Sequence, residues 1–444
     1  MPPPFGPTPS IEAFPAEPSA HLTLAAEREA AGDALGALAH RLAAQALESY
    51  ANGAGIEAAQ PLLTVGTGYF MKGEHDTARR WYALALSIDP SLAAAWQNLA
   101  AIHADAHRDD EAAHCRDEAY RIQRVFVESA YADARRVLVL CAGRAAGNVP
   151  FELLLPTARF TRIKYAFDYG SATEDAQLPA ADVVFNAIGE PDIAAPYDER
   201  LTRYGAQCAQ PLLNPQEQVA RTRRDRLPAL LDGIENVTTA QCVRLDDASI
   251  ASPSASARLP VLARPAASHG GLGVVRCETA SELAEALAAS TGPQYLTAFH
   301  DCRSADGHYR KYRVVFVDRQ PYPYHLAVSP HWMVHYFSAD MERNAWKLDE
   351  EHRFLRDPTE ALGERAMTAI AAIGARLDLD YAGIDFTLLP DGRVFVFEGN
   401  ATMLVHRERA DGVLAHKNDY VQRIADAFGR LVERKAAAAR NQRA

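Results

Sequence analysis

The chain changes character once, near Arg136, and this change most constrains what it can fold into. Residues 22–127 are rich in Ala and show helical periodicity without strand-like alternation. After Arg136, short apolar runs such as 137–140 alternate with helix-like segments, as expected of parallel strands covered on both faces. At 444 residues the chain is also too long to fold around a single hydrophobic core. We therefore expect an all-α domain followed by an α/β (α+β) part.

Within the helical part, one stretch matches the 34-residue spacing of a tetratricopeptide repeat. The matching positions are Leu62, Gly66, Tyr69, Gly73, Ala78, Tyr82, Ala85 and Pro90. A looser copy follows 34 residues later from Trp96, and 25–58 is at most a degenerate third copy. Stacked hairpins of this kind present a concave face, so the resemblance implies binding of a peptide or partner. A helical cap or a dimerisation element, giving a homodimer, is the alternative.

Composition sets further limits. The Pro-rich residues 1–21 predict a disordered lead-in, followed by helical repeats over 22–130. A small open α/β domain is expected over 135–215, a second region over 216–434, and a flexible tail over 435–444.

Charge and cysteine usage indicate the class of protein. With 46 Lys and Arg against 57 Asp and Glu, the net charge of −11 argues against a general nucleic-acid or anionic-membrane binder. The first 20 residues have neither a basic n-region nor an apolar run, so they are not expected to act as a secretory signal, and no apolar stretch approaches the ~18 residues of a membrane helix. The six cysteines are scattered without a CxxC pair, which favours a reducing cytoplasm.

A glycine-rich loop between two short strands is the first candidate for chemistry. The first strand carries a fixed cation, Arg264, and three glycines among four residues follow at Gly270, Gly271 and Gly273. Glycines permit positive φ and leave backbone N–H groups free to lie against phosphate oxygens. The loop 268–273 therefore predicts a lid over a nucleotide, with a plain flexible hairpin as the alternative.

The most specific pattern is an acidic hairpin near the C-terminal end. Asp391 and Gly392 separate two strand-like runs and predict a two-residue turn. With that turn, Asp385 lies opposite Glu398, and Asn400 lies two residues further along on the same face.

The same register places Phe386 opposite Phe397, on the side given to the core. On the other side, two opposed carboxylates repel each other. A hard divalent cation, Mg²⁺ or Mn²⁺, is the natural group to offset this repulsion beside an amide oxygen. A solvated acidic edge, or one protonated carboxylate, is the alternative.

Taken together, the Arg264 strand, the glycine loop and the Asp385 … Glu398-Gly399-Asn400 pattern resemble the ATP-grasp superfamily. The pattern is similar to D-alanine–D-alanine ligase, glutathione synthetase and the ribosomal-protein glutamate ligases. The resemblance covers about 136–432 and does not extend to the repeats. It implies a pre-ATP-grasp α/β domain over 135–215 and an ATP-grasp domain over 216–434, which grips ATP between antiparallel sheets. The implied activity is carboxylate–amine ligation through an acyl-phosphate, with ATP and Mg²⁺ (or Mn²⁺) required and ADP and phosphate released.

The resemblance also implies roles for individual residues. Arg264 on the nucleotide phosphates and Arg313 at the reaction centre would be the catalytic cations. Contacts to ATP are implied for Arg264, Ser268, His269, Gly270, Gly271, Gly273, Tyr295, Leu296, Thr297, Phe299 and Lys311. The metal ligands would be Asp385, Glu398 and Asn400.

Two departures from the family pattern leave the substrates open. Lys311 stands where some relatives have an acid, and Asp301 is the candidate for the ribose-binding acid. Residues 401–404 read Ala-Thr-Met-Leu rather than Thr-Ser-Pro-Gly, so the acceptor side differs.

Two further clusters have alternative interpretations. His325, His331 and His335 lie among aromatic residues, and the spacing of the last two would suit a transition metal on a helix. A strand and loop at a substrate pocket, with structural histidines, fits better. The arginines of the segment 219–231 suit either a polyanionic ligand or a solvated face.

The fused repeats favour a peptide or protein substrate, captured away from the chemistry. The alternatives are a ligase that joins two small molecules, a carboxylate and an amine, with the repeats used for oligomerisation, and an inactive scaffold that only senses ATP. An inactive scaffold would be expected to lack the metal ligands.

Overall fold

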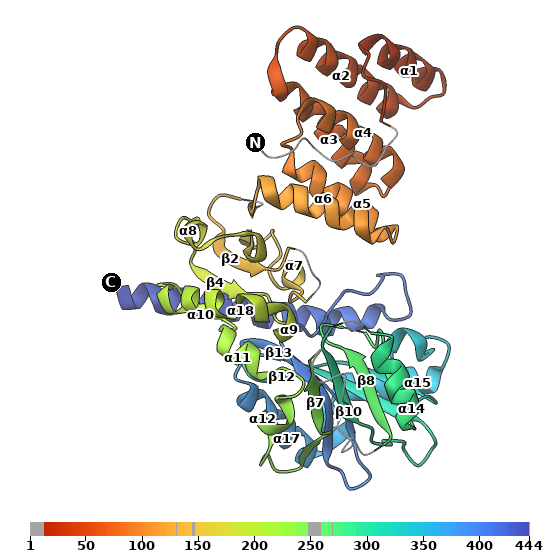
Figure 1. The fold of residues 1–444 in the computed structure, drawn as a ribbon, viewed down its shortest axis with the longest axis vertical. Helices are drawn as coiled ribbons and strands as arrows, with labels where there is room; N and C mark the ends of the chain where they lie inside the picture. Colours follow the sequence, from red (N-terminus) through yellow and green to blue (C-terminus); the bar gives the residue numbers. More distant parts are fainter. Residues whose placement is uncertain are drawn as a thin grey trace. The chain divides into compact units, whose positions relative to one another are not determined.

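The computed structural model describes residues 13–129, 131–143, 147–246, 259–268, 270–290 and 292–443 (Figure 1). The chain divides into two compact units, Met1–Arg124 and Val125–Ala444. Among the described residues, no helix combines the length and apolarity needed to cross a bilayer.

The first unit is all-helical. Its helices are α1 (Pro18–Ala30), α2 (Ala34–Ala51), α3 (Ala59–Met71), α4 (His75–Ile88), α5 (Ala93–Asp105) and α6 (Asp109–Ile122). They pack as three successive hairpins, α1 with α2, α3 with α4 and α5 with α6. Helices α3 and α5 begin 34 residues apart, as do α4 and α6, which is the interval expected from the sequence. The helical region is thus confirmed, and its tetratricopeptide nature stays a prediction.

Small residues set the spacing of the α3–α4 hairpin. Trp81 and Tyr82 of α4 are fully buried, and Gly66 of α3 faces them. A Cβ added at Gly66 would lie 2.9 Å from the Tyr82 ring and 3.2 Å from the Trp81 Cβ. The glycine therefore allows the two helices to approach closely.

We expect Gly66→Ala to destabilise the helical unit by about 1–3 kcal/mol, because the added methyl group overpacks the contact with Tyr82. Gly68→Ala, two residues along the same helix, is the matched control. Nothing lies within 4 Å of a Cβ at Gly68, so this change should stabilise α3 by about 0.5–1 kcal/mol. Urea unfolding of both variants measures the difference; equal effects would contradict the close approach.

The second unit begins with a five-stranded sheet of order β1-β3-β2-β4-β5. Its strands are β1 (Val125–Glu128), β2 (Arg135–Cys141), β3 (Phe160–Ala166), β4 (Val183–Asn186) and β5 (Leu212–Leu213). All neighbours pair in parallel except β1, which pairs antiparallel with β3. The expected runs at 163–167 and 183–185 fall in or beside strands β3 and β4. Because β1 belongs to this sheet, the α/β part starts ahead of residue 135, where the sequence analysis placed its beginning.

Helices cover both faces of this sheet. Its short helices are α7 (Phe151–Leu154), α8 (Ala172–Asp175), α9 (Pro191–Ala194) and α10 (Asp198–Gln207). Leu201 of α10 packs in the core of one face, and the long helix α18 (Asn418–Arg443) packs against the other through Phe428 and Leu431. Residues 435–443, expected as a flexible tail, continue α18, and Ala436 is buried in the core.

A four-stranded antiparallel sheet of order β7-β10-β8-β9 follows. Its strands are β7 (Cys242–Leu245), β8 (Val261–Pro265), β9 (Val275–Cys277) and β10 (Gln294–Ala298), with helix α14 (Ala280–Ala288) packed on it. Helix α14 begins at a capping box in which Thr279 and Glu282 satisfy each other's backbone N–H groups.

The last sheet has the order β12-β11-β13-β14-β6. Its strands are β6 (Val237–Thr239), β11 (Tyr309–Val317), β12 (Gln320–Ser329), β13 (Tyr381–Leu388) and β14 (Val394–Asn400). The associated helices are α11 (Gln216–Arg221), α12 (Leu227–Leu231), α15 (Ala345–Arg356), α16 (Pro358–Leu362) and α17 (Glu364–Leu377). The expected fold class is confirmed at this level: an all-α region followed by α/β domains with three sheets.

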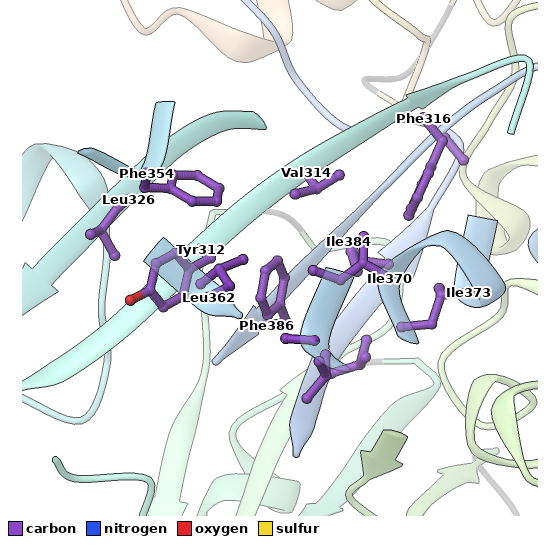
Figure 2. Packing of buried hydrophobic residues seen from close by; sticks show 14 of the residues in the cluster. Tyr312, Val314, Phe316, Leu326, Phe354, Leu362, Ile370, Ile373, Ile384 and Phe386 are labelled. Carbon is purple, nitrogen blue, oxygen red and sulfur yellow. The ribbon is translucent and has the colours of Figure 1, made fainter. Parts of the chain in front are cut away.

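One face of this sheet is apolar along its whole length. Figure 2 shows Tyr312, Val314, Ile384 and Phe386 facing side chains of the helices, among them Phe354 of α15. Because side chains alternate along a strand, the residues between them point to the opposite face. These intervening residues include the charged side chains Lys311, Arg313 and Asp385.

The β13–β14 hairpin keeps the expected pairing of Asp385 with Glu398, but its turn and its strand geometry differ from those expected. The turn has three residues rather than two: Leu389 N–H donates to the Arg393 carbonyl, and Gly392 adopts φ +79°. This shifts the register by one residue.

A bulge in β14 then restores the register. Phe386 pairs with Val396 while Asp385 pairs with Glu398, so Phe397 has no residue opposite it. The prediction that Phe397 faces Phe386 in the core was therefore wrong. The Phe397 side chain is instead 41% exposed and lines a cavity.

Candidate active site

A cavity of about 250 Å³, here called the inter-sheet cavity, lies between the four-stranded antiparallel sheet and the last, five-stranded sheet. Strands β8 and β10 line one side, and β11, β13 and β14 line the other. The glycine loop contributes Gly270 and Gly271, and a second loop contributes residues 332–335. This placement brings the two candidate patterns of the sequence, the glycine loop and the acidic hairpin, into one site.

Four polar side chains form a row across the last sheet. His325 on β12 pairs with Arg313 on β11, Arg313 pairs with Asp385 on β13, and Asp385 pairs with Glu398 on β14. Side chains at paired positions point to the same face. Arg313, Asp385 and Glu398 accordingly all line the inter-sheet cavity.

Asp385 is held by two cations. Arg313 donates from Nε to Oδ1 at 2.6 Å and from Nη2 to Oδ2 at 2.8 Å. The Lys311 Nζ lies 3.2 Å from the same Oδ2. Burial alone would raise the pKa of Asp385, but Arg313 and Lys311 hold it well below its usual value.

Glu398 is held by a different cation. Arg224 donates from Nη2 to the Glu398 Oε2 at 2.6 Å, and the Glu398 side chain is 23% exposed. Burial works to raise the pKa of Glu398, but the Arg224 charge outweighs it and the pKa falls to about 2. Protein cations therefore compensate both carboxylates, a role that the sequence pattern had predicted for a divalent metal ion.

The charged lining is cationic overall. Among the described residues it contains five cations, Arg224, Arg264, Arg310, Lys311 and Arg313, and two carboxylates, Asp385 and Glu398. Arg264 donates to the Ser268 carbonyl and hydroxyl, and burial lowers its pKa to about 10, with the neighbouring Arg224 adding to the effect. Arg310 is paired with Asp306 and Glu350 outside the cavity, so the excess of positive charge comes from the other four, partly buried cations. Such an excess suits an anionic ligand such as a polyphosphate.

The glycine loop has the backbone that the sequence predicted. Gly270, Gly271 and Gly273 adopt φ of +62°, +79° and +70°, while His269 lies outside the described residues. A Cβ at Gly270 would lie 3.5 Å from His335 Nε2, and one at Gly271 would lie 3.5 Å from Met333 Sδ. The loop thus meets the 332–335 loop over the cavity.

The residues predicted beside adenine divide into two groups. Thr297 and Phe299 line the inter-sheet cavity. Tyr295 is buried and donates its hydroxyl to Asp192 at 2.7 Å, and Leu296 packs in the core beneath α14. The side chains of Tyr295 and Leu296 therefore stabilise the sheet, and their backbone roles stay predictions.

The histidine cluster lies on a strand and a loop, as its flanking residues indicated. Strand β12 ends at Ser329, and the following loop brings His335 to the cavity wall. His325 stacks on Tyr336 with ring centroids 5.0 Å apart, and burial together with the Arg313 charge places its pKa well below its usual value.

Asn400, the last residue of β14, does not line the inter-sheet cavity. Its side-chain oxygen accepts hydrogen bonds from the backbone N–H and the hydroxyl of Thr402, at 3.0 and 3.1 Å. In the part of the chain that the structure describes, no group of three or more His, Cys, Asp or Glu side chains is placed to hold a metal ion. The donors Glu398 and Asn400 are hard oxygens that fit Mg²⁺ or Mn²⁺ when ligand oxygens complete the coordination. The assignment of Asp385, Glu398 and Asn400 as metal ligands stays a prediction.

Arg224 and Met333 line the cavity but were not among the predicted site residues. Arg224 lies in the basic segment whose role was left open, and Met333 lies in the loop beside the histidines, next to Trp332, which the sequence had placed with them at a substrate pocket. The one available signal for Arg224 was its position within a run of arginines. Nothing in that run distinguishes it from Arg223, which pairs with Asp225 instead.

A buried acid lies near this group. Glu190, in the loop between β4 and α9, is 5% exposed, and burial raises its pKa to about 7 against the opposing charge of Arg224. A raised folded-state pKa means that ionisation disfavours folding, so stability falls as pH rises from about 4.5 to 7.

We expect Glu190→Gln to stabilise the protein at pH 8 by up to about 3 kcal/mol, and to have little effect at pH 5. The reason is that Gln keeps the shape of the side chain without the charge that must be buried above pH 7. Glu217→Gln, at an exposed position, is the control and should stay within about 0.5 kcal/mol at both pH values. Urea unfolding at the two pH values tests the prediction, and a pH-independent effect would contradict it.

Comparison with known proteins gives structural likeness only. No family model and no curated protein matches the chain. Among solved structures, D-alanine–D-alanine ligase from Bacillus anthracis complexed with ATP matches 70% of this chain and 100% of its own, at 13% identity and a TM-score of 0.44. The VanG D-Ala:D-Ser ligase from Enterococcus faecalis matches 67% of this chain and all of its own, at 12% identity and a TM-score of 0.39.

A third solved structure, the D-cycloserine synthetase DcsG, matches 68% of this chain and 100% of its own, at 17% identity and a TM-score of 0.39. These identities and TM-scores are too low to assign an activity to the chain.

Proposed function

We propose that this protein is an ATP-dependent carboxylate–amine ligase that acts through an acyl-phosphate and releases ADP and phosphate. The observation that carries the proposal is the inter-sheet cavity, in which a surplus of fixed cations and an opposed carboxylate pair lie beneath a glycine-rich hairpin loop. Fixed positive charge of this kind stabilises the charge that develops in phosphoryl and acyl transfer.

The chain's own residues have separable roles in this proposal. Arg264, partly buried on β8 beside the glycine loop, binds nucleotide phosphate oxygens, and loop N–H groups from Ser268 to Gly273 support it. Arg313, anchored on Asp385, directs positive charge toward the transferring phosphoryl group. The backbone of β10 and the side chains of Thr297 and Phe299 would contact the adenine.

A divalent cation, Mg²⁺ or Mn²⁺, would be held by Glu398 with Asn400 beside it, and would neutralise phosphate charge when bound. The two loops that meet over the cavity would exclude water from it. This matters because an acyl-phosphate exposed to water would hydrolyse. Gly270 and Gly271, opposite His335 and Met333, supply the flexible side of this cover.

The substrate class is proposed from the fused helical unit. Two successive helical hairpins, α3–α4 and α5–α6, at a 34-residue interval suit capture of a peptide or protein tail, which would then present the carboxylate or the amine. The alternative is a ligase for two small molecules, with the helical unit used for oligomerisation. An inactive scaffold that senses ATP is disfavoured because Asp385, Glu398 and Asn400 are all present. The cytoplasm is the proposed compartment.

The decisive experiment incubates the full chain with ATP, Mg²⁺ and pooled amino acids or peptides. Formation of ADP and phosphate that depends on the added pool supports a ligase, and AMP would contradict the proposed chemistry. Comparison of free amino acids with peptides separates the two substrate classes. ATP binding without turnover on any pool would favour the inactive scaffold.

A further inference from the structure

The two carboxylates of the inter-sheet cavity are not equivalent, and the difference bears on how many metal ions the site takes. Asp385 accepts three contacts from two cations: two from the Arg313 guanidinium and one from the Lys311 ammonium. Its side chain is 3% exposed. Glu398 forms an ion pair with Arg224 through Oε2, and its side chain is 23% exposed.

The strand that carries Lys311 sets the direction of its side chain. Lys311 lies two residues before Arg313 on β11, so both side chains point to the cavity face of the sheet. A lysine ammonium is a compact point charge with three donors, and at 3.2 Å from Oδ2 it lies within ion-pair distance of the carboxylate. Lys311 also lines the cavity, where an anionic ligand would reach it.

Two positive charges on one buried carboxylate leave little attraction for a third. A divalent ion at Asp385 would displace Lys311 or lie against both like charges in a partly desolvated site. At Glu398, a divalent ion meets a carboxylate that lines the cavity and is more exposed than Asp385.

From this contrast we propose that the site binds one divalent cation per nucleotide, at Glu398, and that the Lys311 ammonium takes the place of a second cation at Asp385. The ligand class is a nucleoside triphosphate with a single divalent cation. Lys311 and Arg313 would neutralise the phosphate charge that this one cation leaves uncompensated. This inference rests on the proposed function, because it presupposes nucleotide binding in the cavity.

The test counts Mn²⁺ ions on the full chain. Equilibrium dialysis with saturating β,γ-imido-ATP, read out by electron paramagnetic resonance of Mn²⁺, should give one bound Mn²⁺ per bound nucleotide in the wild type. Lys311→Asp, which replaces the ammonium with an oxygen ligand, should give two. Lys311→Met should weaken nucleotide binding about tenfold or more, because one phosphate-facing charge is lost.

The matched control is Lys435→Met. The Lys435 Nζ also lies near a buried aspartate, 3.8 Å from Asp380, but neither residue lines the inter-sheet cavity. This variant should keep one Mn²⁺ and unchanged nucleotide affinity. Two Mn²⁺ per nucleotide in the wild type would overturn the inference while leaving the proposed function standing, and a single Mn²⁺ in a folded Lys311→Asp variant would also count against it. Absence of nucleotide binding in the wild type would overturn the proposed function itself.

Discussion

Glu398→Gln is expected to reduce ATP turnover by at least about 100-fold while the protein stays folded. The substitution keeps the size and the hydrogen-bonding shape of the side chain, so Arg224 retains an acceptor. It removes the negative charge that the structure opens to the inter-sheet cavity, and with it the carboxylate proposed to hold the divalent cation. Phosphate release, measured beside thermal melting, separates lost chemistry from lost fold.

Asp391→Asn is the matched control for this variant. Asp391 lies in the turn of the same hairpin, and its side chain is 52% exposed, so the same change of charge is made outside the cavity. Turnover should be unaffected. Asn400→Ala, which removes the neighbouring amide oxygen, should also abolish turnover. Full activity in both Glu398→Gln and Asn400→Ala would refute the metal assignment.

Arg313→Met is expected to destabilise the second unit by about 3 kcal/mol or more. Arg313 makes both hydrogen bonds of a bidentate pair with Asp385, and the two side chains are 15% and 3% exposed. Without the guanidinium, Asp385 is left as a buried charge with Lys311 as its remaining recorded cation. Urea unfolding measures the loss. Arg434→Met, which breaks a largely exposed pair with Asp318, should cost only about 0–1 kcal/mol.

The pH dependence of this variant has a definite sign. In the wild type, the pKa of Asp385 is held below its unfolded value near 3.9, so its stabilising contribution is constant over pH 5–8 and is lost only as pH falls through the folded pKa. In Arg313→Met the pKa of Asp385 rises, because burial is less opposed. The deficit of the variant should therefore shrink as pH falls toward 5, and adding Asp385→Asn should recover part of the stability. A deficit that is independent of pH and is not reduced by adding Asp385→Asn would show that Arg313 acts through packing alone.

Much of the fold could be predicted because its signals are local. The Ala-rich helical pattern, the apolar run of β2 and the glycines of the loop each depend on a few neighbouring residues. The boundaries were less certain: β1 joins the sheet and 435–443 continues a helix. In both cases, partners distant in sequence decide the outcome, since β1 pairs with β3 and α18 packs between two sheets.

In the acidic hairpin, two departures from the expected geometry cancel, so the predicted pairing is kept. The expected two-residue turn has three residues, and a bulge at Phe397 shifts the strand back by one, so Asp385 still meets Glu398. Turn length and bulge position depend on how the hairpin packs against the rest of the sheet, which the turn residues alone do not specify.

The sequence by itself determined that Asp385 and Glu398 share one face of a hairpin, because alternation along a strand is local geometry. Only the tertiary structure decided which charges meet them. Arg313 and Lys311 reach Asp385 through the pairing of β11 with β13, and Arg224 reaches Glu398 from a segment more than 170 residues earlier in the chain. Electrostatic compensation acts through space between groups that folding brings together, so it leaves no pattern in the spacing of residues along the chain.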